Sequence, residues 1–261
     1  MGMSSGRAMV TNARPTSRMG LKAINLPLMA LATFSAGLVL AACGQNGEAT
    51  KSGPQIIKDT AAALQTAKSY RLEGVVPISG SSGSFTFDVA GAAVGAGTFT
   101  LGSLTFQLDE IRGTDYIKSK TLWQGIDGGA LQSLLANRWV SIPANNPLAK
   151  QLTTGLASLT SARQEAQAIL KGEAGAKRGR SGTSGGQAVI QVSEGTGSTA
   201  SVVYVATSGA PYPVRVVGQG KDYLALSDYN QNFNVTAPHG SVSLLDVIAG
   251  LGAGFGSGPR S

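Results

Sequence analysis

The sequence of 261 residues has one cysteine, one histidine and only 13% charged residues, and each shortage excludes a class of protein. A single cysteine cannot form an internal disulfide. One histidine, one cysteine and scattered acids cannot assemble a zinc or redox site, so we expect no metal and no cofactor. A helix bundle would need a surface rich in Glu and Lys. A low charge content with 36 glycines instead favours an all-β or α+β domain with many turns.

The formal net charge of +7 arises mostly at the N-terminal end of the sequence. Residues 1–42 hold four of the 21 basic residues and none of the 14 acidic ones, so residues 43–261 carry a net charge of only +3. Nucleic-acid binding normally needs a clustered basic face. We therefore expect no nucleic-acid partner.

An apolar run, Leu26–Leu40, follows the cations Arg14, Arg18 and Lys22 and is too short for a comfortable membrane span. The run ends in Leu40-Ala41-Ala42-Cys43. A cationic segment, a short apolar segment and small residues form the pattern of a secretory signal peptide. Lipoprotein signal peptidase recognises an aliphatic residue and two small residues before a cysteine whose thiol receives diacylglycerol. The sequence therefore predicts lipidation of Cys43.

This pattern predicts a signal peptide over residues 1–42 and a mature chain that begins at Cys43. The mature chain is expected to be lipid-anchored on the extracytoplasmic face of a bacterial cell membrane. A transmembrane anchor or a buried apolar helix, each with a chance cysteine, is the alternative. Met3 and Met19 are further candidates for the start of translation. Residues 43–54 are expected to form the lipidated cysteine and a polar tether that holds a domain clear of the bilayer.

Apolar periodicity divides the remaining sequence into a helix, a run of strands, central helices and a second run of strands. Residues 55–68 carry apolar residues at helical spacing without Gly or Pro. Strand-like alternation follows, most clearly at Phe85, Phe87 and Val89, and residues 91–97 are expected as a turn. Strand-like alternation of apolar residues returns at residue 188 and ends at residue 235.

The central stretch has leucines at helical spacing, namely Leu148, Leu152, Leu156 and Leu159. Residues 172–186 follow and are expected as a Gly/Ser-rich loop that carries Lys177, Arg178 and Arg180. These cations are either solvated or in contact with anionic lipid headgroups. The sequence leaves both alternatives open.

Two motifs suggest catalysis, and neither fits it. Gly182–Gly186 matches the nucleophile-elbow pattern G-x-S-x-G, but it lies in a flexible glycine tract, and the sole histidine, His239, stands near the end of the last expected strand. Asp109 and Glu110 are neighbours on a strand, so their side chains point to opposite faces and are expected to be solvated. The sequence therefore predicts no enzymatic activity and no catalytic residue.

Short segments in a fixed order carry a resemblance to a known family. They are Asp59-Thr60-Ala61 with Leu64, Gly113-Thr114-Asp115-Tyr116-Ile117-Lys118 before Trp123, Arg138-Trp139-Val140-Ser141-Ile142-Pro143, Tyr212-Pro213-Val214-Arg215-Val216, and Leu226-Ser227-Asp228-Tyr229-Asn230 ahead of Ala237-Pro238. Behind the Cys43 motif, residues 55–240 resemble the LprG/LppX family of actinobacterial lipoproteins and, more distantly, lipoprotein carriers of the LolA type. The resemblance implies an α+β fold with a strongly curved antiparallel sheet, an unclosed half-barrel, whose concave face is covered by helices.

The resemblance also implies an apolar cavity for acyl chains, a lipid or glycolipid ligand, and a membrane exporter as a further partner. An apolar sheet face has to be buried, and helices that cover it incompletely leave a space that acyl chains fill better than water. The candidate lining consists of Phe85, Phe87, Phe99, Phe106, Leu148, Leu152, Leu156 and Leu159. Packing in a closed core is the alternative for each of these residues.

The expected organisation is a signal peptide (1–42), a lipidated cysteine with tether (43–54), a lipid-binding domain (55–240) and a Gly-rich C-terminal tail (241–261). We expect a membrane-anchored lipoprotein, not an enzyme, that carries lipids or lipidated molecules across the cell envelope. The alternative is an envelope scaffold lipoprotein, also without catalysis, that acts through protein partners.

Overall fold

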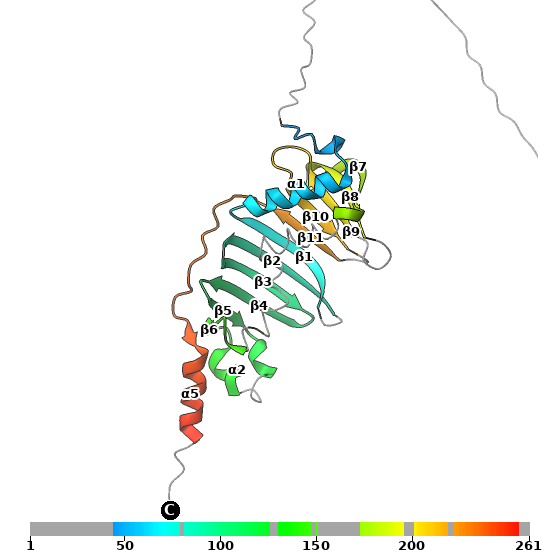
Figure 1. Ribbon diagram of the computed structural model, residues 1–261. Helices are drawn as coiled ribbons and strands as arrows, with labels where there is room; N and C mark the ends of the chain where they lie inside the picture. The colour runs from blue at the N-terminus through cyan, green and yellow to red at the C-terminus, as the bar shows by residue number, and fades with distance from the viewer. Residues whose placement is uncertain are drawn as a thin grey trace, which may run out of the picture. The chain divides into compact units, whose positions relative to one another are not determined.

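The computed structural model describes residues 44–78, 81–125, 130–147, 150, 173–195, 201–218 and 222–255. These residues belong to one compact unit, Ala42–Ser261. Its main element is a twelve-stranded sheet with the strand order β12-β6-β5-β4-β3-β2-β1-β11-β10-β9-β8-β7 (Figure 1).

The strands are β1 Tyr70–Ile78, β2 Ser81–Gly91, β3 Val94–Leu101, β4 Leu104–Ile111, β5 Thr114–Ser119, β6 Val140–Pro143, β7 Lys177–Ser184, β8 Gln187–Glu194, β9 Ser201–Ala206, β10 Pro213–Val217, β11 Tyr223–Ser227 and β12 Val242–Ser243. The α-helices of the described residues are α1 Gly53–Thr66, α2 Ala130–Leu135 and α5 Leu244–Phe255. Short 3-10 helices are η1 Glu48–Thr50, η2 Leu122–Gly125 and η4 Glu173–Gly175.

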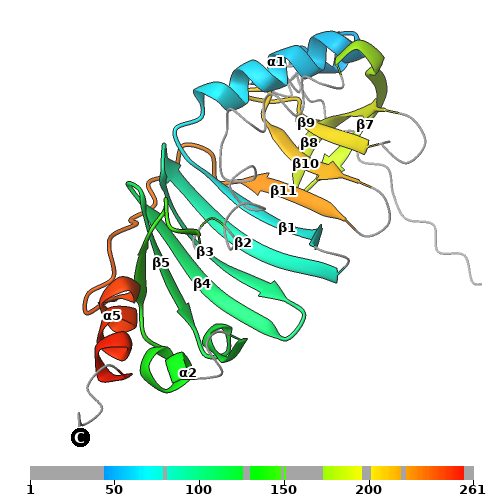
Figure 2. The ribbon, with the colours of Figure 1, turned by 60° about the horizontal axis from the view of Figure 1, so that its bottom comes forward.

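The sheet consists of two antiparallel halves joined in its middle. Strands β1 to β6 pair in chain order, and so do β7 to β11, while β1 pairs with β11 to connect the halves. Strand β12 adds to β6 in parallel. Strands β7 and β12 remain as edges, so the sheet does not close, and Figure 2 shows it as a bent, open layer. This confirms the predicted α+β fold with a curved antiparallel sheet that forms an unclosed half-barrel.

Helix α1 covers part of the apolar face of this sheet. Its buried side chains recur on one side of the helix, and they are Ile56, Ile57, Thr60, Ala61 and Leu64. Pro54 lies in the first helical turn, where a missing N–H leaves no intrahelical bond unmade. The central helical stretch that carries Leu148, Leu152, Leu156 and Leu159 lies, apart from Lys150, outside the described residues.

Two segments that were expected to be irregular are strands. The expected turn over 91–97 is confined to the two residues between β2, which ends at Gly91, and β3, which begins at Val94. The expected loop over 172–186 contains strand β7, Lys177–Ser184, which pairs with β8. Sequence periodicity misses the first half of β3 and all of β7, because glycines in β3 and polar residues in β7 replace the apolar alternation. Conversely, no strand forms at residues 233–235, where the last one was expected.

The two ends of the described chain are bound to the sheet. Residues 44–52 belong to the expected tether (43–54). They form the helix η1 and an isolated β-bridge between Gln45 and Ser208. At the other end, the tail continues as α5, in which Leu244 is buried and Val247 and Leu251 pack against the core. The first two turns of this helix therefore pack partly against the core.

Candidate functional site

Four phenylalanines of three neighbouring strands form one stack on the apolar face, which we call the phenylalanine ladder. The strand register places Phe85 opposite Phe99, and Phe99 opposite Phe106. The ring centroids of Phe85 and Phe99 lie 5.7 Å apart, and those of Phe99 and Phe106 lie 5.3 Å apart. Phe87 contacts Phe99 from the next inward position of β2, at 5.7 Å between centroids. Side-chain geometry of this kind stabilises aromatic pairs beyond the effect of burial alone.

Two glycines of β3 provide the space in which Phe87 lies. A Cβ atom on Gly95 would lie 2.6 Å from Cζ of Phe87, and one on Gly97 would lie 2.6 Å from its Cδ2. Side chains do not fit at these distances, so the ring packs directly against the backbone of the neighbouring strand. The glycines that sequence periodicity assigns to a turn therefore belong to the site.

The ladder lies within a larger apolar face. On one side Leu72 of β1 pairs with Leu226 of β11. On the other side Leu108 of β4 lies opposite Ile117 of β5, which in turn lies opposite Val140 of β6. All five side chains are buried. An apolar face of this extent has to be covered by protein or by a ligand, because its exposure to water is unfavourable.

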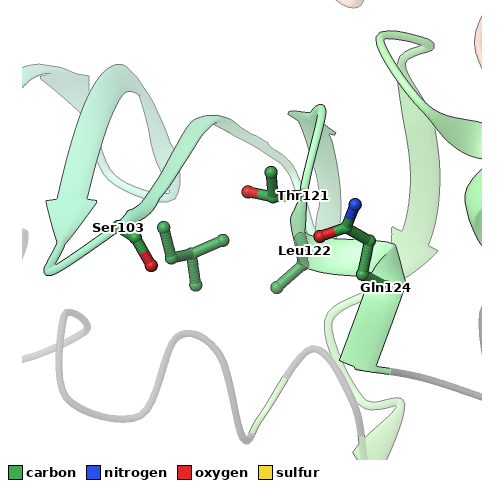
Figure 3. Close-up of a pocket in the computed structure, with 5 residues that line it drawn as sticks. Ser103, Thr121, Leu122 and Gln124 are labelled. Atoms are coloured by element: carbon green, nitrogen blue, oxygen red, sulfur yellow. The ribbon is translucent and has the colours of Figure 1, made fainter.

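A pocket of about 560 Å³ opens beside one end of the ladder. Its lining residues are Ser103, Leu104, Thr121, Leu122 and Gln124. Figure 3 shows Ser103 on one side and Thr121, Leu122 and Gln124 on the other. Leu104 and Phe106 are two residues apart on β4, so they share a face of the sheet. Both Leu104 and Leu122 pack against the core, so the apolar wall of the pocket continues the ladder.

Ser119 fixes the chain that forms one wall of this pocket. Its buried hydroxyl donates a hydrogen bond to the carbonyl of Thr105, at 2.8 Å. The same oxygen accepts hydrogen bonds from the backbone N–H groups of Thr121 and Leu122, at 3.2 and 3.1 Å. The end of β5 is thereby tied to β4 and to the start of η2, which places Leu122 at the pocket.

Two acids interrupt the apolar face near its other end. The two-residue turn at Arg112 and Gly113 has positive φ at both residues, 49° and 86°, as a tight hairpin requires. This turn places Glu110 of β4 opposite Asp115 of β5. Burial raises the pKa of Glu110 to about 7, and the charge of Asp115 contributes a smaller part of this rise. Burial raises the pKa of Asp115 to about 6, and its Oδ2 has no hydrogen-bond partner.

Asp109 and Glu110 are half-buried, which corrects the prediction that they are solvated charges. The two side chains do point to opposite faces, as neighbours on a strand must. Burial nevertheless raises the pKa of Asp109 to about 6 as well as that of Glu110. The Glu110–Asp115 pair is missed when one strand is considered alone, and the hairpin signal at Arg112-Gly113 would have revealed it.

The remaining predicted site residues cannot be placed on this face. Leu148, Leu152, Leu156 and Leu159 lie outside the described residues, as does Cys43. Of the predicted cavity lining, the structure thus brings together the four phenylalanines, whose exposure is 1–5%. That they line a cavity stays a prediction, and packing in a closed core is its alternative.

The described residues offer no arrangement for hydrolysis or metal binding. Gly182–Gly186 form the end of β7 and the turn into β8, whereas a nucleophile elbow needs a strand followed by a helix. His239 is exposed in a segment without regular structure. Within the described ranges no group of three or more potential ligands could hold a metal ion. None of the helices described there is long and apolar enough to cross a membrane.

Known structures share this architecture at low sequence identity. LprF from Mycobacterium bovis matches with a TM-score of 0.50 and 14% identity, over 76% of this chain and 100% of LprF. The chain has the LprF fold. The lipoprotein LppX from Mycobacterium tuberculosis matches with a TM-score of 0.44 and 15% identity, over 70% of this chain and 97% of LppX.

The LprF fold confirms, at the level of architecture, what the resemblance of the sequence implied. No protein-family model and no curated protein sequence matches the chain. At 14% identity, the match to LprF shows a shared arrangement of the sheet and its helices.

Proposed function

We propose that the chain is a lipoprotein, anchored through diacylglycerol on Cys43 to the extracytoplasmic face of the cell membrane. It binds lipids or lipidated molecules and carries them across the cell envelope without catalysis. The observation that carries this proposal is the phenylalanine ladder, an apolar stack on an open sheet that continues into the 560 Å³ pocket. The resemblance of the sequence to lipoprotein carriers supports the same function.

The chemistry of the face suits acyl chains. An acyl chain needs no polar partner, and each methylene that leaves water contributes about 0.8 kcal/mol to binding. A chain laid along the ladder would meet aromatic rings and leucines throughout. The pocket adds Ser103, Thr121 and Gln124, whose side chains can form hydrogen bonds with the hydroxyl groups of a lipid or glycolipid headgroup.

A scaffold lipoprotein that acts through protein partners is the second candidate. It is favoured by the low exposure of the ladder, at 1–5% for all four rings. Side chains buried to this extent are also typical of a closed core. The two candidates differ in whether the mature protein contains a bound lipid.

The first measurement is the native mass of the protein purified from its own membrane. The carrier function predicts a mass above that of the polypeptide with its Cys43 lipid, and the excess should be released by solvent extraction. A mass that contains only the polypeptide and its anchor would contradict the carrier function and favour the scaffold.

The second measurement compares two tryptophan variants of β4. Leu104→Trp adds volume at the pocket, so it should keep the melting temperature of the wild type and lose most of the bound lipid. Gln107→Trp adds the same group at an exposed position of the same strand and should keep both. Overpacking would instead lower the free energy of unfolding by about 1–3 kcal/mol. If Leu104→Trp melts well below the wild type for this reason, the pocket has no room for a ligand.

A further inference from the structure

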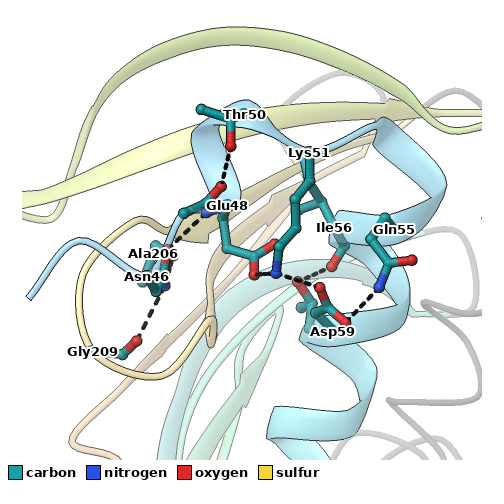
Figure 4. A network of polar contacts seen from close by, with 11 residues as sticks. Asn46, Glu48, Thr50, Lys51, Gln55, Ile56, Asp59, Ala206 and Gly209 are labelled. Atoms are coloured by element: carbon teal, nitrogen blue, oxygen red, sulfur yellow. Dashed lines mark hydrogen bonds and ion pairs between the residues drawn. The ribbon is translucent and has the colours of Figure 1, made fainter.

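The residues that follow Cys43 are attached to the sheet and leave no free tether. The backbone N–H of Gly209 donates to the carbonyl of Gly44 at 2.9 Å, and the N–H of Asn46 donates to the carbonyl of Thr207 at 3.0 Å. The side-chain amide of Asn46 donates to the carbonyls of Ala206 and Gly209, at 2.9 and 3.2 Å (Figure 4). The first described residue after Cys43 is thus already bound to the turn after β9.

The next residues continue this attachment toward α1. Nζ of Lys51 lies 2.6 Å from Oε1 of Glu48 and 2.7 Å from Oδ2 of Asp59 on α1. Gln55 donates from Nε2 to Oδ1 of Asp59 at 2.8 Å, and Figure 4 shows these contacts as one network. The carboxylate of Glu48 is almost fully buried, at 2% side-chain exposure. A segment held by so many contacts cannot extend as a flexible spacer.

The attached segment also reaches the edge strand β7. Nη1 of Arg178 donates to the carbonyl of Ala49 at 3.0 Å. A Cβ atom on Gly53 would lie 2.9 Å from the backbone nitrogen of Arg178, so the start of α1 lies directly against the start of β7. The edge strand and the residues next to the anchor therefore form one end of the sheet (Figure 1).

This end carries exposed cations. Lys177, Arg178 and Arg180 are all exposed on β7. The acids Glu48 and Asp59, which lie nearby, both contact Lys51. Charged residues on an edge strand prevent pairing with a second sheet, which explains cations there but not their position beside the segment that follows the anchor.

We propose that β7 is the membrane-facing edge of the protein, and that Lys177, Arg178 and Arg180 contact the headgroups of anionic lipids. The proposal rests on the proposed lipidation of Cys43. One residue spans at most about 3.6 Å, so a lipid on Cys43 holds Gly44 at the headgroup layer, and the attached segment from Gly44 to Gly53 connects it to the start of β7. Each cation near an anionic leaflet strengthens binding about fivefold. The opposite edge, β12 with α5, then points away from the membrane.

The test couples the mature chain from Cys43 onward to vesicles through a maleimide lipid. Cys43 is the only cysteine, so the chemical anchor forms whether or not a cell lipidates it. Failure of this proposal is thereby distinguishable from failure of the lipidation proposal. Lysines are then acetylated with an N-hydroxysuccinimide ester, and the rate at each lysine is read by mass spectrometry. The vesicles contain phosphatidylcholine alone or a mixture with phosphatidylglycerol.

Lys177 should be acetylated several-fold more slowly on the phosphatidylglycerol vesicles, while the exposed Lys68 and Lys120 should react at equal rates on both. High salt should remove the difference, because it screens the headgroup charge. Equal rates at Lys177 on both vesicle types, or equal protection of Lys120, would overturn the proposal.

A charge-matched pair of variants provides a second readout without any anchor. Lys177→Gln with Arg180→Gln should weaken binding of the uncoupled chain to phosphatidylglycerol vesicles about thirtyfold, as expected for two cations. Lys68→Gln with Lys120→Gln removes the same charge elsewhere and should leave binding nearly unchanged. Equal losses in both variants would mean that net charge, and not the β7 edge, determines binding.

Discussion

Replacing Glu110 by glutamine should remove part of the pH dependence of the stability of this domain. Glu110 lies opposite Asp115 on the apolar face, and burial raises its pKa from 4.5 to about 7. An unfolded chain exposes the carboxyl group to water, where its pKa is close to the ordinary value. Between about pH 4.5 and pH 7 the folded protein therefore holds a proton that the unfolded chain has lost.

The sign and the size of the effect follow from this difference. The free energy of unfolding falls as the pH rises through the window, because the folded state must ionise a buried group. A pKa of about 7 in place of 4.5 corresponds to at most about 3 kcal/mol. Partial access of water to Glu110 reduces the expected effect to about 1–3 kcal/mol. Glutamine cannot ionise, so Glu110→Gln should be more stable than the wild type by this amount above about pH 7.

Urea unfolding of the mature chain at about pH 5 and about pH 8, followed by circular dichroism, measures the effect. The wild type should be less stable at the higher pH, and Glu110→Gln should show a smaller difference. A residual dependence is expected from Asp109, Asp115 and Glu194, whose pKa values burial also raises. Glu73→Gln, at an exposed site, is the control and should behave as the wild type does. Wild-type stability that stays constant or rises with pH would refute this reasoning.

Three further predictions concern the anchor and the ladder. Cys43→Ala should abolish fatty-acid labelling and leave unprocessed precursor, and normal labelling would overturn the lipidation of Cys43. Phe99→Ala removes a ring that is 1% exposed and should lower the free energy of unfolding by about 3–5 kcal/mol, whereas Thr98→Ala on the exposed face should change it by less than about 0.5 kcal/mol. Gly97→Ala should cost about 1–3 kcal/mol because its Cβ would overlap Phe87, while Gly182→Ala, with open space around it, should be tolerated; equal denaturation midpoints for the two variants would contradict the packing of Phe87.

The sequence predicts the apolar face well wherever side chains alternate. Phe85, Phe87 and Val89 indicate their strand and its inward face directly, and the structure buries all three. Alternation is informative there because one face of an antiparallel sheet is buried and the other is exposed. The fold could also be predicted, since the order of short segments resembles a family with this architecture.

Strand β7 could not be predicted in the same way. Lys177–Ser184 has no apolar residue, and seven of its eight residues are exposed. Its strand conformation comes from backbone pairing with β8. This pairing is a tertiary interaction, and it leaves no apolar alternation in the sequence of β7. The attachment of residues 44–52 depends in the same way on carbonyl groups of a distant turn, at Ala206 and Gly209.

The pairing of β1 with β11, in the middle of the sheet, joins two segments that are far apart in the sequence. It joins Arg71 to Ser227 and Val75 to Tyr223, whereas β2 to β5 fold back on their immediate neighbours in the chain. Closing such a long loop costs entropy before the contacts form, which slows folding. A chain that emerges with its N-terminus first leaves one edge of β1 unpaired until β11 follows. Joining of the two halves is therefore the expected slow step of folding, and a chain interrupted before β11 would expose that edge to aggregation.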